Sequence, residues 1–502
     1  MKILFNTIYK KIYAFAFLGC VAVLPMSDTI ALRNIFLASM LFLIVYGVMF
    51  SFDIRKDFSR SIKLIPIPLL LWILYLCIFP LWAPMPTIAW ENLRGQWGES
   101  IIAWTVGLGA AVVFRGDGPD LWDIGLASAF PLIIHLLLAC LAYFGVFSVD
   151  YYGRQSLAGL FLEFTNWLSK DSITHQYFHP LEHGFLGIET QPGNIGYASS
   201  VSIGIFSLLY FISKRNHDLK AAGKALLLII LCFLSVLIAR SRGGFLFGLL
   251  IIGLVALLIR FSSKSMRANV HGAENVTHTL PKINFFLLSV ILVFVCISYV
   301  GIKSDPRWGA MADKVRAGFL ITDPISTLCN GLSDDEERAI RARLSIKSRE
   351  YADYVIDGVK GEDGGRVILM RAGIQLVLKN PVGLDGSRQS YERLIRLECN
   401  KPPALNFANA HNSWIDLSLG LGWVGVALFS TLFLYFIRFA MLQTSSTDAK
   451  PFIVLLGLLA AFWIVRGFFD AVFREHYLEM QGLLIAYLYM STVLKFSKKN
   501  EE

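Results

Sequence analysis

The sequence predicts an all-α polytopic membrane protein with about twelve transmembrane helices and one long polar segment. Its 502 residues are 55% hydrophobic and only 17% charged, and the mean hydropathy is +0.57, whereas a soluble domain of this length carries more charge. Uninterrupted apolar runs of about 20 residues, the length that crosses about 30 Å of hydrocarbon, recur along the chain. A membrane β-barrel is not expected, because its strands would form short alternating segments.

Nine apolar runs precede the polar segment and three follow it. The first run has no signal-peptide cleavage site, and a second follows at once, so both are expected to remain as spans. The expected spans are residues 12–27, 29–50, 64–83, 99–115, 123–147, 193–212, 224–240, 243–260, 283–302, 412–437, 451–470 and 477–494. The expected domains are residues 1–302 with spans 1–9 and an outer loop at about 148–192, the polar loop 303–410, and residues 411–502 with spans 10–12 and a tail.

Lysine and arginine residues in the short loops give the orientation. With the N-terminus inside, the inner segments hold 21 of these residues and the short outer segments hold 8. Both termini are therefore expected inside the cell and the polar loop outside. The net charge of +9 reflects this inner collar, which can pair with anionic lipid headgroups and does not indicate binding to nucleic acid.

The polar loop is expected to be mainly helical. The charged run from Asp334 to Arg349 predicts one solvated amphipathic helix. Residues 364–378 predict a helix of about four turns with an apolar face, which ends at Asn380-Pro381. Residues 381–402, punctuated by glycine and proline, predict a loop.

Two patterns in the outer segments leave alternatives open. Cys329 and Cys399 are the polar-exposed cysteines, and an oxidising compartment would join them as a disulfide; two reduced thiols that never meet would have the same spacing. Three histidines at positions 175, 179 and 183 have the spacing of metal ligands on a helix. Pro180 interrupts that helix, so solvated or sugar-facing histidines are expected there, and no metal.

Charged groups at the ends of spans are costly in a membrane and mark candidate functional sites. Arg240 and Arg242 lie between the seventh and eighth spans, next to Gly243-Gly244. A single arginine could extend to the interface, but two beside a glycine pair and a helix start predict an anion site.

Three more charged residues lie in or near the last spans. Arg466 and Asp470 are one helical turn apart and are expected to pair. Asp416 is expected either to line a cavity or to pair with an arginine of a span.

A histidine begins the tenth span, where the polar loop ends. His411 alone is more typical of a structural hydrogen-bond partner, since Asn412 is a good N-cap residue and explains the local polarity. Arg240, Arg242 and Arg366 are expected on the same outer face, and arginine suits bidentate recognition of phosphate. Histidine suits proton transfer near neutral pH. The combination predicts a site for a lipid-linked diphosphate leaving group and an acceptor hydroxyl.

Three patches of the sequence resemble the O-antigen ligase family, which shares its fold and motifs with the O-antigen polymerases. Ala239-Arg240-Ser241-Arg242-Gly243-Gly244 is similar to the family's Ser-Arg-Gly turn, and Arg242 takes the motif arginine. Gly365-Arg366, followed by Pro381, resembles a loop helix that starts with an essential arginine. The run from His411 to Asp416 resembles the family's His-Asn helix start.

The chain departs from the family pattern at several positions. Met370 stands where an aromatic residue is usual, and Gly420 where an acidic residue is common. The glycine spacing of the turn at 381–386 is shifted, while residues 387–391 look like a ligase subgroup. These departures spare the motif arginines and the histidine.

The resemblance implies a GT-C-like glycosyltransferase in the bacterial inner membrane, with its active site on the periplasmic face. Such a protein moves O-antigen polysaccharide from undecaprenyl diphosphate to a sugar hydroxyl of lipid A–core, with inversion and without a metal or cofactor. It implies that Arg242 and Arg366 bind the diphosphate, and that His411 accepts or orients the acceptor's proton. Supporting roles fall to Arg240, Arg388 and Asn412.

Other functions remain open on the sequence alone. An O-antigen or exopolysaccharide polymerase and a protein O-oligosaccharyltransferase would use similar parts. A transporter of the lipid-linked glycan belongs to another class and should show charges near the bilayer midplane and repeated halves. Here the charges cluster at the outer face and no halves are evident.

Overall fold

The computed structural model describes most of the chain, and its described elements are helices. The described residues are 2–26, 29–115, 118–143, 192–239, 241–268, 306–361, 363–443 and 450–501, with the single residues 295 and 299. Several predicted features lie outside this set: Arg240, the histidines at 175, 179 and 183, nearly all of the outer loop 148–192, and most of the ninth span at 283–302. Within the described set no strand occurs, so the predicted all-helical class is confirmed there.

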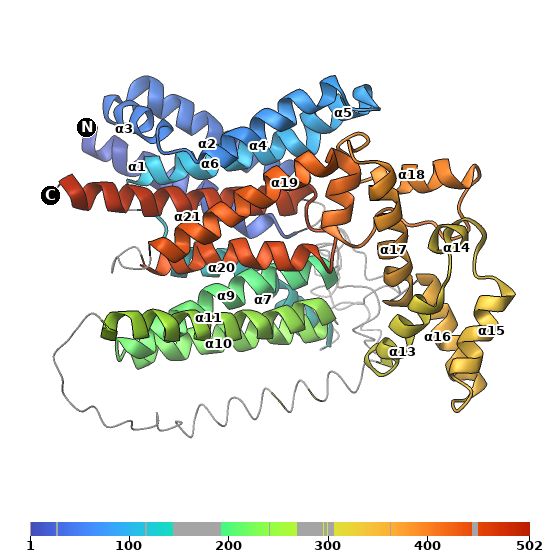
Figure 1. The fold of residues 1–502 in the computed structure, drawn as a ribbon. Coiled ribbons are helices and arrows are strands. Elements are labelled where there is room, and N and C mark those ends of the chain that lie inside the picture. The colour runs from blue at the N-terminus through green and yellow to red at the C-terminus, as the bar shows by residue number, and fades with distance from the viewer. Residues whose placement is uncertain are drawn as a thin grey trace, which may run out of the picture.

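The helices form a bundle and a second group that corresponds to the polar loop (Figure 1). The bundle contains α1 (Lys2–Val23), α2 (Ile30–Phe50), α3 (Phe52–Ile62), α4 (Ile67–Ile78), α5 (Pro86–Asn92), α6 (Gly98–Phe114), α7 (Leu121–Tyr143), α9 (Pro192–Arg215), α10 (Leu219–Ile238), α11 (Arg242–Ala268), α19 (Ser413–Leu442), α20 (Lys450–Gly467) and α21 (Glu475–Glu501). A 3₁₀ turn (η1, Phe79–Leu81) follows α4, and a π-helical turn (η2, Leu93–Trp97) joins α5 to α6. The second group, called the loop helices below, contains α13 (Pro306–Leu320), α14 (Pro324–Asn330), α15 (Asp334–Arg343), α16 (Arg349–Gly361), α17 (Asp363–Lys379) and α18 (Ser390–Cys399).

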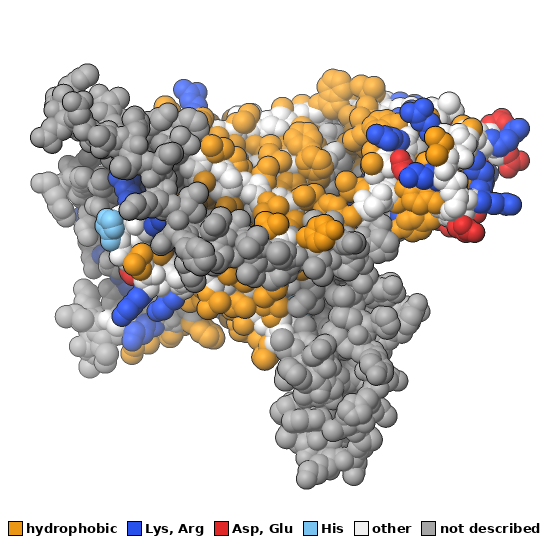
Figure 2. Space-filling view, turned by 90° about the horizontal axis from the view of Figure 1, so that it is seen from below, with side chains coloured by type: hydrophobic (Ala, Val, Ile, Leu, Met, Phe, Trp, Pro, Cys, Tyr) orange, Lys and Arg blue, Asp and Glu red, His pale blue; other side chains and the backbone are white. Residues whose placement is uncertain are grey.

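The bundle has the composition of a multi-pass membrane domain. Six described helices are long and apolar enough to cross a membrane, or up to seven if α3 and α4, bent by 85° at their junction, count as one broken span. Every predicted span except the ninth coincides with a described helix; the total of about twelve stays a prediction. On the face shown in Figure 2, the described side chains in the middle are mainly hydrophobic and the charged ones gather toward the two ends, as a hydrocarbon layer between two aqueous phases requires.

The loop helices lie at one end of the bundle, and both ends of the chain lie at the other (Figure 1). Their apolar core includes Ile340, Val355 and Leu369 and extends to Ile415 and Leu419 of α19. Cys329 and Cys399 are joined as a disulfide, with their Cα atoms 5.2 Å apart. The bond ties α14 to the end of α18.

One prediction about the polar loop is wrong because the chain starts a new helix. The single helix expected from Asp334 to Arg349 ends at Arg343, and α16 begins at Arg349. Between them, Ser348 Oγ accepts a hydrogen bond from Tyr351 N at 3.2 Å. A serine in this position caps a helix start, so it separates α15 from α16.

The prediction of a loop at residues 381–402 is also wrong, because the glycines and prolines that flank a short helix there are typical of a loop. The loop expected at 381–402 contains α18. This helix buries Tyr391, Leu394 and Ile395 on one face, the spacing of an amphipathic helix.

A tight turn before α18 docks into a break in α19. The helix loses its regular geometry at Gly422, where φ is 72° and ψ is −179°, a conformation that is open essentially to glycine alone. Trp423 N cannot bond within the helix there and donates to Pro381 O at 2.9 Å. A Cβ on Gly383 would lie only 2.4 Å from Gly422 N. Residues 381–386, called the docked turn below, thus complete the broken helix.

Candidate functional site

The predicted site residues come from separate parts of the chain that meet at the end of the bundle beside the loop helices. Arg242 is the first residue of α11, and Arg366 lies in the first turn of α17. His411 lies two residues before α19, and Arg388 lies between the docked turn and α18. Arg240 lies outside the described residues.

Arg242 makes a bidentate ion pair with Asp363, the first residue of α17. Nη1 lies 2.7 Å from Oδ2, and Nη2 lies 2.9 Å from Oδ1. Only 17% of the Arg242 side chain and 10% of the Asp363 side chain are exposed, so the pair is shielded from solvent and stronger than a surface pair. The guanidinium also lies 5.9 Å from the centre of the Trp308 ring of α13. The predicted diphosphate-binding arginine therefore holds a carboxylate that the sequence analysis missed.

A buried arginine connects the start of α11 to the segment between α20 and α21. A Cβ on Gly243 would lie 3.1 Å from both terminal nitrogens of Arg466, so the absent side chain makes room for this guanidinium. Arg466, only 2% exposed, donates to Asp470 Oδ2 at 3.2 Å, the pairing that the one-turn spacing predicted. Its guanidinium lies 4.8 Å from the Tyr197 ring and 4.5 Å from the Phe247 ring.

The same segment holds the start of α19. Asn412 caps this helix with its side-chain oxygen, and its Nδ2 donates to Phe468 O at 3.0 Å. Ser413 Oγ donates to Asp470 O at 2.6 Å and accepts from Phe473 N at 3.1 Å. Residues 468–473 therefore fix the backbone on which His411 sits.

His411 adopts a constrained conformation before this capped helix. Its φ of 49° is left-handed, which is uncommon for a residue other than glycine, and its backbone N donates to Asn409 Oδ1 at 2.9 Å. Ring atom Nδ1 is buried and has no hydrogen-bond partner among the described residues. An imidazole held in this way can accept a hydrogen bond or a proton from a hydroxyl group.

Burial and neighbouring charges lower the pKa of His411 from 6.5 to about 4. Burial is the largest cause; Arg366 and Arg474 lower the pKa further, while Asp470 raises it. Burial also acts to raise the pKa of Asp470, but neighbouring cations, Arg466 first, hold it below its ordinary value. At neutral pH the imidazole is therefore uncharged and the carboxylate ionised.

Two arginines act on His411 without a carboxylate of their own. Neither Arg366 nor Arg474 makes an ion pair with a described residue, whereas Arg388 pairs with Glu475. Arg366 is exposed. Arg474 is half-buried, and its Nε is shielded and has no hydrogen-bond partner among the residues that the structure describes. Uncompensated guanidinium groups of this kind bind anions. Arg474 was not predicted as a site residue, although a charged side chain at the end of a span is a signal of such a site.

Asp416 lines a small cavity beside the start of α19. Its Oδ1 accepts a hydrogen bond from Ala410 N at 2.9 Å. The cavity has a volume of about 20 Å³, and Asn409, Ser413 and Arg474 are among its other lining residues. This is room for about one water molecule. Asp416 was expected either to line a cavity or to pair with an arginine of a span, and in the structure it lines this cavity.

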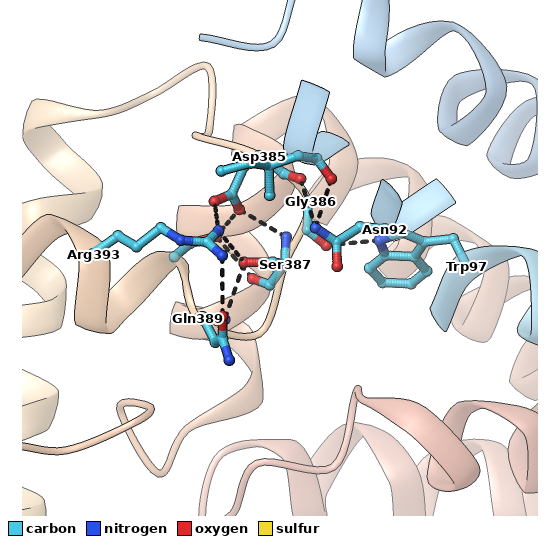
Figure 3. Close-up of polar contacts among 9 residues, drawn as sticks. Asn92, Trp97, Asp385, Gly386, Ser387, Gln389 and Arg393 are labelled. Atoms are coloured by element: carbon cyan, nitrogen blue, oxygen red, sulfur yellow. Dashed lines mark hydrogen bonds and ion pairs between the residues drawn. The ribbon is translucent and has the colours of Figure 1, made fainter. Parts of the chain in front are cut away.

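A buried carboxylate organises the docked turn near the site (Figure 3). Asp385, which has no exposed surface, accepts a hydrogen bond from Ser387 N at 2.8 Å and pairs with Arg393 of α18. On the other side of the turn, Trp97 Nε1 donates to Gly386 O at 2.7 Å. The turn therefore ties α18 to η2 of the bundle.

Comparison with known proteins agrees with the sequence motifs. The family model described as O-Antigen ligase matches residues 226–430, a range that includes Arg242, Arg366 and His411. No curated protein matches the chain. Together with the apolar helices, the family match supports a membrane protein with a ligase-like or polymerase-like role in lipopolysaccharide biosynthesis. Residues 226–430 are therefore similar to the O-antigen ligase family, as the motifs in this part of the chain predicted.

Proposed function

We propose that this protein transfers O-antigen polysaccharide from undecaprenyl diphosphate to a sugar hydroxyl of lipid A–core. The transfer takes place on the periplasmic face of the bacterial inner membrane, with both termini in the cytoplasm. The observation that carries the proposal is the neutral His411 beside Arg366 and Arg474, two arginines without an ion-pair partner in the described part of the chain, at the end of a membrane bundle. An anionic leaving group and a hydroxyl acceptor require these features in one place.

In the proposed reaction, the arginines bind the diphosphate and stabilise the charge that develops on it. As the bond between the anomeric carbon and the diphosphate oxygen breaks, its electron pair stays on the diphosphate. Arg366 is exposed and has no carboxylate partner among the described residues, so it meets the phosphate without first breaking an ion pair there. Arg242 adds a bidentate contact once its pair with Asp363 opens.

His411 orients the acceptor hydroxyl and takes up its proton as the new bond forms. The acceptor oxygen attacks the anomeric carbon from the face opposite the diphosphate, which inverts that centre. With a pKa of about 4, the imidazole of the free protein is a weak base. A bound diphosphate offsets the charges of Arg366 and Arg474, so it raises the basicity of His411.

Transfer in vitro tests the proposal. Purified protein is mixed with lipid-linked glycan and lipid A–core, and ligated lipopolysaccharide is measured. His411→Ala and Arg366→Ala should each lower the rate about a hundred-fold or more, since general bases and charge-stabilising groups contribute on this order. The matched control is Arg396→Ala, which removes an exposed arginine of α18 paired with Glu392 and should retain transfer.

Other products would point to other functions. Longer lipid-linked glycan alone would identify a polymerase, and glycan on a protein acceptor would identify a protein O-oligosaccharyltransferase. Ligation that proceeds normally in both site variants would refute the site assignment.

A further inference from the structure

We propose that Asp363 is a positioning residue that occupies Arg242 in place of the donor diphosphate and releases it when the donor binds. The inference rests on the proposed function, because it takes the diphosphate as the ligand of the same site. The Arg242–Asp363 pair is then a latch between α11 and α17, closed in the free protein and open in the donor complex.

The carboxylate of Asp363 uses the face of Arg242 that a phosphate would use. Each terminal nitrogen donates to a different carboxylate oxygen, at 2.7 and 2.9 Å, which is the pair of parallel bonds that guanidinium also makes to phosphate. A largely buried guanidinium without any anion would be costly. Asp363 removes that cost in the absence of donor, and it has to leave before a phosphate can take the same two donors.

Asp363 retains a favourable position after it leaves Arg242. It is the first residue of α17, where the positive end of the helix dipole stabilises a carboxylate. On release, the diphosphate therefore replaces the Asp363 carboxylate at Arg242, and the carboxylate remains stabilised by the helix dipole.

The latch belongs to the helix that carries Arg366. Asp363 and Arg366 are three residues apart in the first turn of α17, so they are neighbours on one helix face. A donor held by the exposed Arg366 through one phosphate brings a second phosphate toward Arg242, where it competes with the carboxylate. A monophosphate has no second group to compete with. The latch thus favours a diphosphate over a monophosphate.

Binding of inorganic pyrophosphate and inorganic phosphate to the full-length protein in nanodiscs tests the latch. Asp363→Asn should bind pyrophosphate about ten-fold more tightly, the gain expected if the closed latch is roughly nine-tenths populated, and its preference for pyrophosphate over phosphate should shrink. Asp363→Glu can restore the pair and should resemble the wild type. Asp353→Asn breaks a more exposed Arg–Asp pair, with Arg341, away from the proposed site and should also resemble the wild type.

Transfer kinetics and hydrogen exchange provide independent readouts. In Asp363→Asn the KM for the lipid-linked donor should fall while kcat does not rise, whereas a purely structural role would lower kcat and leave the affinity for anions unchanged. In the wild type, pyrophosphate should speed amide exchange in the first two turns of α17. This measurement decides the question even if Asp363→Asn does not fold.

The outcomes separate the latch from the proposed function. Unchanged or weaker pyrophosphate binding by a folded Asp363→Asn, or slower exchange at the start of α17 in the complex, would overturn the latch. A wild-type protein that binds neither pyrophosphate nor undecaprenyl diphosphate would overturn the proposed function, since the site would then have no diphosphate ligand.

Discussion

Arginine side chains at the site differ in what neutralises them. Arg242 and Arg388 each hold a carboxylate, whereas Arg366 makes no ion pair within the described part of the chain. A cation near an imidazole disfavours its protonation, so Arg366 adds to the effect of burial in keeping His411 neutral, and in the proposed reaction it also binds the diphosphate. A single residue thereby couples donor binding to the strength of the base.

The pH dependence of transfer should reflect this low basicity. The pKa of His411 in the free protein is about 4, below the ordinary 6.5, so the imidazole stays neutral and able to accept a proton as the pH falls through 6.5. The acid limb of kcat/KM, which reports the free enzyme, should therefore have its midpoint near 4. An acid limb centred near 6.5 that disappears in His411→Gln would contradict the buried, arginine-flanked imidazole.

Sequence patterns identified the motif residues but not their partners. Arg242 and Asp363 are 121 residues apart, and a contact between distant segments leaves no periodic signal in one sequence. Arg474 was counted as a charge of a short outer segment and nothing more. Asn412, in contrast, was predicted as an N-cap from its residue type and helix position, and its side-chain oxygen has that role.

Helices whose ends are marked by neighbouring residues were predicted, whereas elements that depend on distant parts of the chain were not. Residues 364–378 were expected to be helical, and α17 spans Asp363–Lys379, because a glycine pair and an Asn-Pro pair mark its ends locally. The docked turn could not be predicted, since its geometry depends on a break in α19 far along the chain. The glycine at position 420, where the family commonly has an acidic residue, is explained by the same distant contact. A Cβ there would lie 3.3 Å from Ser387 O, which leaves little room for an acidic side chain.

Gly422→Ala should disrupt the junction between α19 and the docked turn. The backbone conformation there is essentially closed to alanine, and the new Cβ would lie 2.3 Å from Val382 O. We expect a loss of about 3 kcal/mol or more in the free energy of unfolding, measured by denaturation in detergent. Gly253→Ala, in α11, has open space around its Cβ and should change stability little. Equal effects of the two substitutions would contradict the docking.

The disulfide between α14 and α18 should stabilise the loop helices by limiting the unfolded chain. It closes a loop across a sequence separation of 70 residues, for which chain entropy corresponds to about 4 kcal/mol. Cys329→Ser or Cys399→Ser should therefore lower the midpoint of thermal unfolding, and reductant should have no further effect on either variant. Cys77→Ser removes an exposed free thiol and serves as the control. If reductant did not lower the midpoint of thermal unfolding of the wild type, this result would argue against the disulfide.

At the scale of the whole molecule, hydropathy carried most of the prediction. Long apolar runs predict a helical membrane bundle, because only helices and closed barrels satisfy the backbone in hydrocarbon and the strands of a barrel would form short alternating segments. The polar loop, in contrast, packs its apolar side chains together and against the start of α19, and its helix boundaries were only partly predictable. The orientation of the bundle in the membrane remains a prediction from the lysine and arginine distribution. The arrangement agrees with it in placing the loop helices and the chain ends at opposite ends (Figure 1).

The segment between α20 and α21 has a consequence for how such proteins diverge. It holds Ser413 through Asp470, and Asp470 pairs with Arg466 at the end of α20, which lies beside Gly243. The end of α20 and this segment therefore contact two of the three motif patches without belonging to any of them. A substitution in residues 466–473 would move both patches at once, and a compensating change in either patch would be needed to restore the site. Across homologues, this segment and the two patches should therefore change together, and chimeras that exchange the last two helices alone should lose transfer even when every motif residue is kept.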